Sequence, residues 1–232
     1  MEVLTGKYRK RSEAGQIEVN TCNLKLNKRM GLWYRPDTCD LKMLKDGSGD
    51  YPTINCKDRI VFDCGSNVGG FLLKACEEEA KEVYAFEPED FNFDILKVNA
   101  EILKSRYETK IHLIQKAIVP DDTETLQFNV TGSRNSACAG SLMRINGSVP
   151  ITVECINFWK KLDEVKPDLI KMDIEGAEYM FIDRDFPEYV KEVVMELHGF
   201  KKEQNVLMHQ YIERIKNDPN FEIVSLKFVS VF

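Results

Sequence analysis

The sequence predicts an α/β domain with a mostly parallel sheet and helices on both faces. Three observations support this: short apolar runs alternate with helical segments from residue 59 onward, a glycine-rich turn follows the first run, and acidic residues end several later runs. This alternation is typical of parallel strands joined by helices. With 232 residues, 43% of them hydrophobic, the chain is long enough for one sizeable domain. We expect that domain over residues 58–232.

The first 57 residues are predicted to form an N-terminal extension with β character. Polar and apolar residues alternate over residues 16–26, which is typical of short, half-buried strands. Residues 31–52 contain several glycines, prolines and aspartates and are therefore expected to form loops that lead into the domain. The extension could act as a cap that binds the substrate, with Trp33 and Tyr51 available to pack against it.

The elements of the domain are expected in a regular order. Strands are predicted at residues 60–63, 82–86, 110–118, 150–155, 168–174 and 190–197, with a final pair within 221–232. Helices are predicted at residues 71–80, 91–103, 158–165 and 202–217, with one more from about residue 178. The polar stretch 121–148, with a short strand at 125–130, is long for a compact domain, so we expect it to close over a site.

The turn that follows residues 60–62 is the first candidate site. Gly65 and Gly69 allow a tight turn into a helix, where a ligand can approach the backbone N–H groups closely. A dinucleotide-binding turn would have glycine in place of Asn67, and Asp63 would repel a pyrophosphate. The ammonium and sulfonium groups of S-adenosylmethionine would instead be attracted by Asp63. The turn therefore favours S-adenosylmethionine over NAD.

Glu87 is the second candidate, because it ends the next predicted strand and is followed by Pro88. In mononucleotide-binding folds, an acidic residue about 20 positions beyond the glycine turn accepts hydrogen bonds from ribose hydroxyls. Glu87 stands about 20 residues beyond the turn and is predicted to bind the ribose of the cofactor.

Carboxylates also gather at the ends of two later strands. Asp173 and Glu175 end one predicted strand, and Glu196 and His198 lie on one face of the next by the two-residue alternation. Because open α/β sheets bind ligands outside the carboxyl ends of their strands, Asp173 is expected in the same crevice as the glycine turn. Asp173 or His198 is predicted to remove a proton from a hydroxyl, beside Glu175.

A divalent metal ion is a second use of the same cluster. Asp173, Glu196 and His198 could hold Mg²⁺ or Mn²⁺, which prefer oxygen ligands and lower the pKa of a bound hydroxyl. A purely structural interpretation is also open: Glu178 would favour the start of a helix, and Glu196 would pair with Lys171.

Composition narrows the class of protein. The net charge is −6 and the Lys and Arg residues are scattered, which argues against a nucleic-acid substrate. No apolar run approaches the ~20 residues of a membrane span, and no signal-peptide core is visible, so we expect a cytoplasmic protein. The seven cysteines include no CxxC pair and are expected to be reduced and mostly buried.

Taken together, these blocks resemble the FkbM-type methyltransferases. The resemblance covers residues 62–69, 83–88, Asn99, 117–118 and 169–178. It implies a Rossmann-like class I methyltransferase fold with a seven-stranded sheet, and an O-methyltransferase that acts on a sugar hydroxyl of a glycan or glycoconjugate. It also implies the residues that surround S-adenosylmethionine, which are Asp63, Gly65, Ser66, Asn67, Gly69, Glu87, Pro88, Lys116, Ala117 and, in a serine-rich segment, Ser136.

Three alternatives stay open. An RNA or DNA methyltransferase is disfavoured because base-methylating sites commonly resemble Asn/Asp-Pro-Pro-Tyr, whereas this chain has Asp173-Ile174-Glu175-Gly176. An NAD-dependent oxidoreductase is disfavoured by Asp63 and Asn67. A non-catalytic binding module that keeps the fold would bind the cofactor weakly or not at all.

Overall fold

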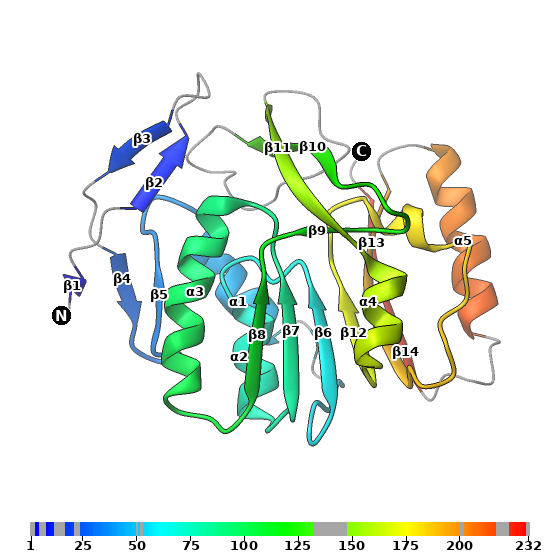
Figure 1. Cartoon of the computed structure of the whole chain (residues 1–232), viewed down its shortest axis with the longest axis horizontal. Helices are drawn as coiled ribbons and strands as arrows, with labels where there is room; N and C mark the ends of the chain where they lie inside the picture. Colours follow the sequence, from blue (N-terminus) through cyan, green and yellow to red (C-terminus); the bar gives the residue numbers. More distant parts are fainter. Residues whose placement is uncertain are drawn as a thin grey trace.

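The computed structural model is built around a six-stranded sheet in which all five pairings are parallel (Figure 1). It describes residues 3–4, 8–11, 17–20, 24–49, 51, 53–131, 148–199, 202–216 and 223–230. The strands, in spatial order, are β14 (Ile223–Ser230), β13 (Glu192–Gly199), β12 (Leu169–Met172), β6 (Ile60–Cys64), β7 (Glu82–Phe86) and β8 (Lys110–Ile114). The predicted parallel α/β fold is confirmed, but within these ranges the sheet has six strands rather than seven.

Helices cover both faces of the sheet because neighbouring strand residues point to opposite sides. Val61 packs into a cluster with α2 (Gly70–Glu77) and α3 (Asp90–Lys104). Phe62 packs into a second cluster with α4 (Phe158–Val165) and with Tyr211 of α5 (Lys202–Lys216). The strand order reverses between β6 and β12, which is where open sheets of this kind bind ligands.

Two elements differ from the sequence prediction, and two others lie only partly within the described residues. The expected strand 110–118 is two strands, because the chain leaves the sheet after Ile114 and β9 (Ala117–Val119) joins β11 (Ser148–Asn157) and β10 (Thr125–Thr131) in a smaller sheet. The helix expected from residue 178 is a single 3-10 turn, η1 (Glu178–Phe181). Of the final strand pair, only β14 lies within the described ranges. The predicted covering loop is β-structure at its two ends, and residues 132–147 lie outside the described residues.

The N-terminal extension has the β character that its alternation predicts. β1 (Val3–Leu4), β4 (Leu24–Asn27) and β5 (Leu32–Tyr34) form one small sheet, and β2 (Tyr8–Arg11) pairs with β3 (Ile17–Asn20). The loop expected over residues 31–52 was wrong, because β5 and α1 (Asp40–Gly49) both lie within it. Glycines allow α1 to pack closely on the start of α2: a Cβ on Gly47 would lie 2.7 Å from the backbone nitrogen of Phe71.

Residues 24–56 share the hydrophobic core of the α/β domain. Leu32 and Leu44 are fully buried in the cluster that contains α2 and α3. The amide of Asn99, on α3, accepts from the Trp33 N–H at 2.8 Å and donates to the carbonyls of Trp33 and Val68. This buried amide therefore fastens β5 to the glycine turn. The domain boundary predicted after residue 57 stays a prediction.

The cysteines differ in part from the expectation of reduced thiols. Cys56, Cys64, Cys76 and Cys155 are free and buried, as expected, but Cys39 is disulfide-bonded. None of the helices within the described ranges is long and apolar enough to cross a bilayer.

Candidate active site

The glycine turn has the geometry that its sequence predicts. Gly65 and Gly69 adopt φ values of +83° and +99°, and Asn67 adopts +49°. Asparagine is one of the few residues besides glycine that enter this left-handed region readily, which explains how Asn67 replaces the second glycine of a dinucleotide turn. A Cβ on Gly65 would lie 2.0 Å from the Asp173 carbonyl oxygen, so this position accepts only glycine.

A cleft lies at the carboxyl ends of β6, β7 and β12, with about 720 Å³ of open space. Because parallel strands end at the same edge of the sheet, it brings together residues that are far apart in the sequence. The predicted site residues that line it are Gly65, Asn67, Glu87, Pro88, Lys116, Ala117, Asp173 and Glu175. The expectation that Gly65, Glu87 and Asp173 share one crevice is confirmed.

A second pocket adjoins the cleft and shares Gly65, Asn67, Asp173 and Glu175 with it. Its other lining residues include Ser66 and Glu196 from the predicted site. They also include Lys42 and Tyr51 of the N-terminal segment. Asp173 and Glu175 therefore form a wall shared by the two pockets.

Sequence reasoning missed several residues that line the cleft. Met43 comes from α1, Asn92 from α3 and Phe128 from β10. Their sequence context carries no glycine, strand-end or charge signal, because all three reach the site only through tertiary packing.

Two predicted cofactor residues, Asp63 and Gly69, line neither pocket, and a third, Ser136, lies outside the described residues. Asp63 is fully buried beneath the turn, with a carboxylate oxygen 3.3 Å from Lys171 Nζ. Burial alone would lower the pKa of Lys171, but the charges of Asp63 and Asp173 outweigh it and raise the pKa. Lys171 also donates to the Gly65 carbonyl at 2.8 Å, so the pair shapes the turn from below. Gly69 precedes α2 and contacts α3.

Lys171 carries a signal that sequence reasoning could have used. A lysine inside an apolar strand needs a buried counter-ion, because an unpaired charge is costly in the protein interior. The structural interpretation in which Lys171 pairs with Glu196 was wrong. Lys171 instead forms an ion pair with Asp63 on the neighbouring strand.

Glu87 is 5% exposed and is held by backbone N–H groups. Its two carboxylate oxygens accept from Asn67 N at 3.0 Å and from Glu89 N at 2.9 Å. Burial raises the pKa of Glu87, and these donors offset part of the effect, so that the pKa is about 7. Glu87 therefore changes charge near neutral pH while facing the cleft.

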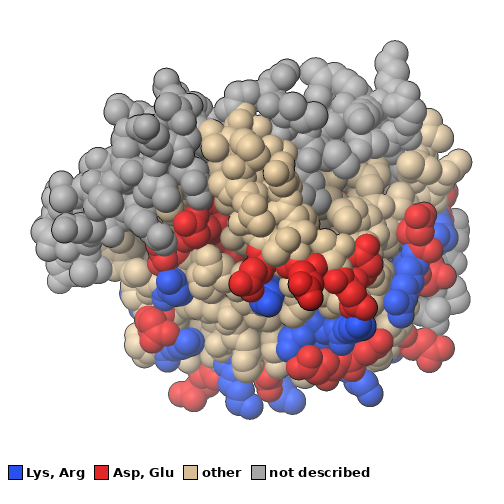
Figure 2. All heavy atoms as spheres, turned by 45° about the horizontal axis from the view of Figure 1, so that its top comes forward, with Lys and Arg blue, Asp and Glu red and all other residues tan. Residues whose placement is uncertain are grey.

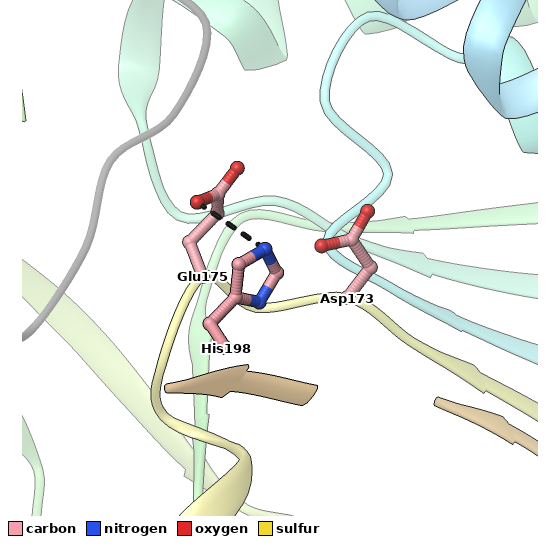
Figure 3. A group of neighbouring side chains, drawn as sticks. All are labelled: Asp173, Glu175 and His198. Carbon is pink, nitrogen blue, oxygen red and sulfur yellow. Dashed lines mark ion pairs between the residues drawn. The ribbon is translucent and has the colours of Figure 1, made fainter. Parts of the chain in front are cut away.

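Asp173, Glu175 and His198 lie together at the shared wall (Figure 3). His198 Nε2 is 3.7 Å from a Glu175 oxygen and 4.0 Å from a Glu196 oxygen. Glu175 adopts a φ of +55°, a costly conformation of the kind that clusters at functional sites.

Glu178 anchors His198 from the opposite side. Its carboxylate accepts from the N–H groups of Ile174 and Gly176 and lies 3.2 Å from His198 Nδ1. Burial would lower the pKa of His198, but Glu178 and the neighbouring carboxylates outweigh it and raise the pKa to about 9. His198 is therefore positively charged at neutral pH and cannot accept a proton there.

The donor set fits a divalent metal ion in part. One ligand atom each from Asp173, Glu175 and His198 lies within 4.8 Å of the others, so the structure groups Glu175 with the predicted pair in place of Glu196. Two carboxylates and an imidazole suit Mg²⁺ or Mn²⁺. Because the imidazole is protonated at neutral pH, a metal ion would have to displace that proton first.

Comparison with known proteins agrees with this geometry. The model of the methyltransferase FkbM domain matches residues 63–222, which is more than half of the chain. No curated protein matches the chain. The matched range begins at the end of β6 and includes the glycine turn, Glu87, Asp173 and His198. The chain therefore belongs to the FkbM methyltransferase domain family.

Proposed function

We propose that this member of the methyltransferase family transfers a methyl group from S-adenosylmethionine to a hydroxyl group. The proposed acceptor is a sugar hydroxyl of a glycan or glycoconjugate. The single observation that carries the proposal is the cleft in which Gly65, Glu87 and Asp173 meet at the switch point of the sheet. Membership in the FkbM family supports the cofactor class.

The residues present fit S-adenosylmethionine. Glu87 faces the cleft with carboxylate oxygens that can accept from ribose hydroxyls, and Lys116 and Ala117 line the part where an adenine would lie. The glycine turn leaves room beside the backbone for the methionine part. When bound, the cofactor supplies a methyl group on a positively charged sulfur. Asp63 supports this site through the turn, because its charge is balanced by Lys171.

Proton removal from the acceptor is assigned to Asp173, beside Glu175. Both carboxylates line both pockets, so an acceptor hydroxyl that enters the site can reach them. His198 balances the charge of Glu175 and Glu178 at neutral pH and holds the turn that carries them. Positioning of the two reactants supplies the remaining acceleration, as in other displacement reactions on enzymes.

A metal requirement is part of the proposal and has its own test. Mg²⁺ or Mn²⁺ held by Asp173, Glu175 and His198 would lower the pKa of the acceptor hydroxyl. The test is metal titration by calorimetry at pH 7, where binding would release the His198 proton, so that the heat depends on the ionisation enthalpy of the buffer. Heats that are identical in PIPES and Tris buffers would exclude His198 as a ligand.

Calorimetric binding of S-adenosylhomocysteine tests the cofactor assignment. Wild type is expected to bind, and Glu87→Ala is expected to weaken binding by at least about tenfold, because two ribose hydrogen bonds to a charged acceptor are lost. Glu101→Ala is the matched control, since this glutamate lies on α3 with its side chain 71% exposed. If wild type does not bind, the cofactor assignment fails and a non-catalytic binding module becomes the better reading.

Turnover tests the acceptor class. S-adenosylmethionine is incubated with a panel of free sugars, glycans, RNA and DNA, and methyl gain is measured by mass spectrometry. Asp173→Asn is expected to reduce turnover by about 100-fold or more while cofactor binding persists, because the amide cannot accept the proton. Methylation confined to RNA or DNA would refute the carbohydrate assignment.

Surface charge favours the carbohydrate over a nucleic acid. On the face that Figure 2 shows, Lys and Arg side chains are interspersed with Asp and Glu side chains. Binding to a polyphosphate backbone relies on clustered positive charge, which this mixed face does not offer.

The cytoplasmic location is also a proposal, and one observation opposes it. Cys39 is disulfide-bonded, whereas thiols in the cytosol are kept reduced. Thiol labelling of the protein isolated from its native compartment, before and after reduction, would decide the matter.

A further inference from the structure

We propose that Arg35 is a positioning residue for the cofactor site: through Asn92 it fixes the carboxylate of Glu87 in the orientation that receives the ribose. The inference rests on the proposed function, because it assumes that Glu87 binds the ribose. Arg35 precedes the range that the family model matches, so the role comes from the N-terminal segment.

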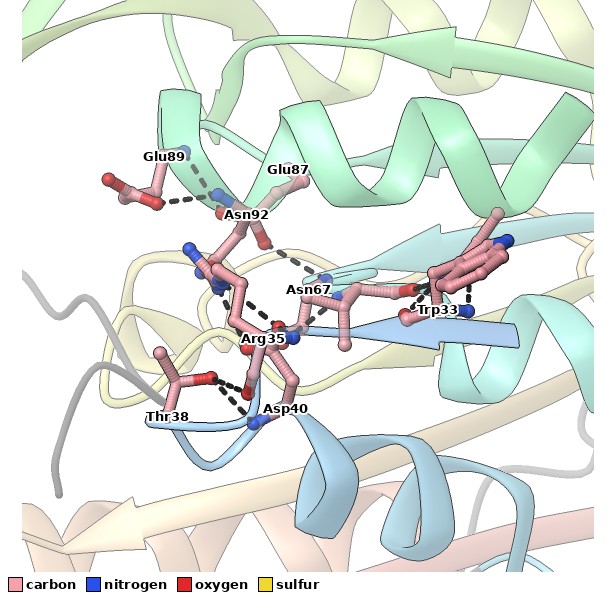
Figure 4. Close-up of polar contacts among 10 residues, drawn as sticks. Trp33, Arg35, Thr38, Asp40, Asn67, Glu87, Glu89 and Asn92 are labelled. Carbon is pink, nitrogen blue, oxygen red and sulfur yellow. Dashed lines mark hydrogen bonds and ion pairs between the residues drawn. The ribbon is translucent and has the colours of Figure 1, made fainter. Parts of the chain in front are cut away.

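Arg35 lies in a fully formed buried network (Figure 4). It is 2% exposed, and its guanidinium donates to both carboxylate oxygens of Asp40, at 2.9 and 2.8 Å. The same guanidinium donates to the side-chain oxygen of Asn92 at 2.6 Å. Asp40 is 1% exposed and Asn92 is 2% exposed, so the contact is shielded from water and is correspondingly strong.

The contact with Arg35 decides which way the Asn92 amide points. A guanidinium has only donors, so the amide oxygen must face Arg35 and the amide nitrogen must face away from it. The Asn92 side chain in turn lies close enough to Glu87 to favour its ionised carboxylate and lower its pKa. An amide in the opposite orientation would present its oxygen to Glu87 and repel it.

The backbone repeats the same connection. Asn92 N donates to Glu89 at 2.7 Å, and Glu89 N donates to Glu87 at 2.9 Å. Asn92, the residue that Arg35 holds, is therefore linked to Glu87 by its side chain and, through Glu89, by its backbone N–H.

Several charged groups face Glu87 and set its protonation. Glu89 and Asp90 lie at the start of α3, and Lys171 lies below the turn. Across the cleft are Lys116, Asp173 and Glu175, and Arg35 with Asp40 completes the set from the N-terminal segment. Burial raises the pKa of Glu89, which neighbours Glu87, and the positive charge of Arg35 lowers it, so Arg35 acts on Glu87 through both Asn92 and Glu89.

Asn92→Asp separates positioning from structural support. The new carboxylate can still accept from Arg35, so the buried link between the N-terminal segment and α3 is kept or strengthened. It has no N–H to donate to Glu87 and adds a negative charge beside it. Both changes should raise the pKa of Glu87, so that a higher pH is needed to ionise it.

The measurement is the affinity for S-adenosylhomocysteine from pH 5.5 to 9.5. Wild-type affinity is expected to fall as the pH drops through about 7, where Glu87 gains a proton. For Asn92→Asp the midpoint is expected to rise by about one pH unit, which weakens binding at pH 7 about fivefold and leaves it near wild type at pH 9.5. Arg35→Lys, which keeps the charge but loses the forked donors, should move the midpoint in the same direction.

Three outcomes overturn the inference, and they are distinguishable. A uniform loss of affinity at every pH would mean general damage, and an unchanged midpoint in both variants would mean that Arg35 supports the fold alone. Both results leave the proposed function intact. Glu87→Gln is the reference variant for the pH dependence of affinity, because its side chain cannot titrate. Absence of binding by wild type would overturn the proposed function and this inference together.

Discussion

Loss of the charge on His198 should be visible in the pH dependence of stability. The pKa of His198 is raised from 6.5 to about 9 in the folded protein, so folding is favoured wherever the imidazole is protonated. The contribution is fully present below pH 6.5 and is lost as the pH rises through 9. A difference of about 2.5 pH units corresponds to about 3 kcal/mol of unfolding free energy.

His198→Asn is the informative perturbation, because the asparagine amide can replace Nδ1 as a donor to Glu178 and cannot titrate. Urea unfolding of both proteins is followed by circular dichroism from pH 6 to 10. The stability advantage of wild type over the variant should shrink by about 3 kcal/mol across this range. A curve for His198→Asn that runs parallel to that of wild type would refute the assigned charge.

Three further predictions concern the support beneath the site. Gly47→Ala should cost about 1–3 kcal/mol in thermal unfolding because its Cβ would meet the backbone of α2, whereas Gly49→Ala, with nothing within 4 Å, should cost nothing. A Gly47→Ala variant as stable as wild type would contradict this close packing. Asn99→Ala should cost about 2–4 kcal/mol in urea unfolding, since three buried backbone groups lose their partner; a loss below 1 kcal/mol would contradict this. Lys171→Met should leave Asp63 as an unpaired buried charge and cost about 3–5 kcal/mol at pH 7, with partial recovery at pH 4; a pH-independent loss would contradict the pairing.

That the site residues meet at one place could be predicted from the sequence, because their meeting depends only on the order and direction of the strands. Parallel strands end at one edge of the sheet, so Gly65, Glu87 and Asp173 had to meet once their strands were recognised. The strands themselves carry strong local signals, with apolar residues on both faces. The side-chain alternation also placed Glu196 beside His198 correctly.

The other features of the fold and the site could not be predicted, because they depend on contacts between distant residues that produce no periodic pattern in the sequence. α1 contains Gly47 and Gly49, which disfavour a helix in isolation, and it forms because Gly47 lets it pack onto α2. Arg35 and Asn92 are 57 residues apart, and nothing local to either residue predicts their contact. The role of His198 was also out of reach, because its protonation depends on Glu178, which a sequence pattern places only at the start of a helix.

The N-terminal segment shares its hydrophobic core with the α/β domain, and this limits where the chain can be truncated or joined to a relative. Similarity begins at residue 63, yet Leu32, Leu44 and Cys56 are completely buried against the helices that follow. A chain started at the border of similarity would expose an apolar surface on α2 and α3 to water. The unit that folds is therefore larger than the unit that is recognisably related. Chimeras with relatives should be joined upstream of residue 24, so that the α/β domain keeps the N-terminal segment that completes its core.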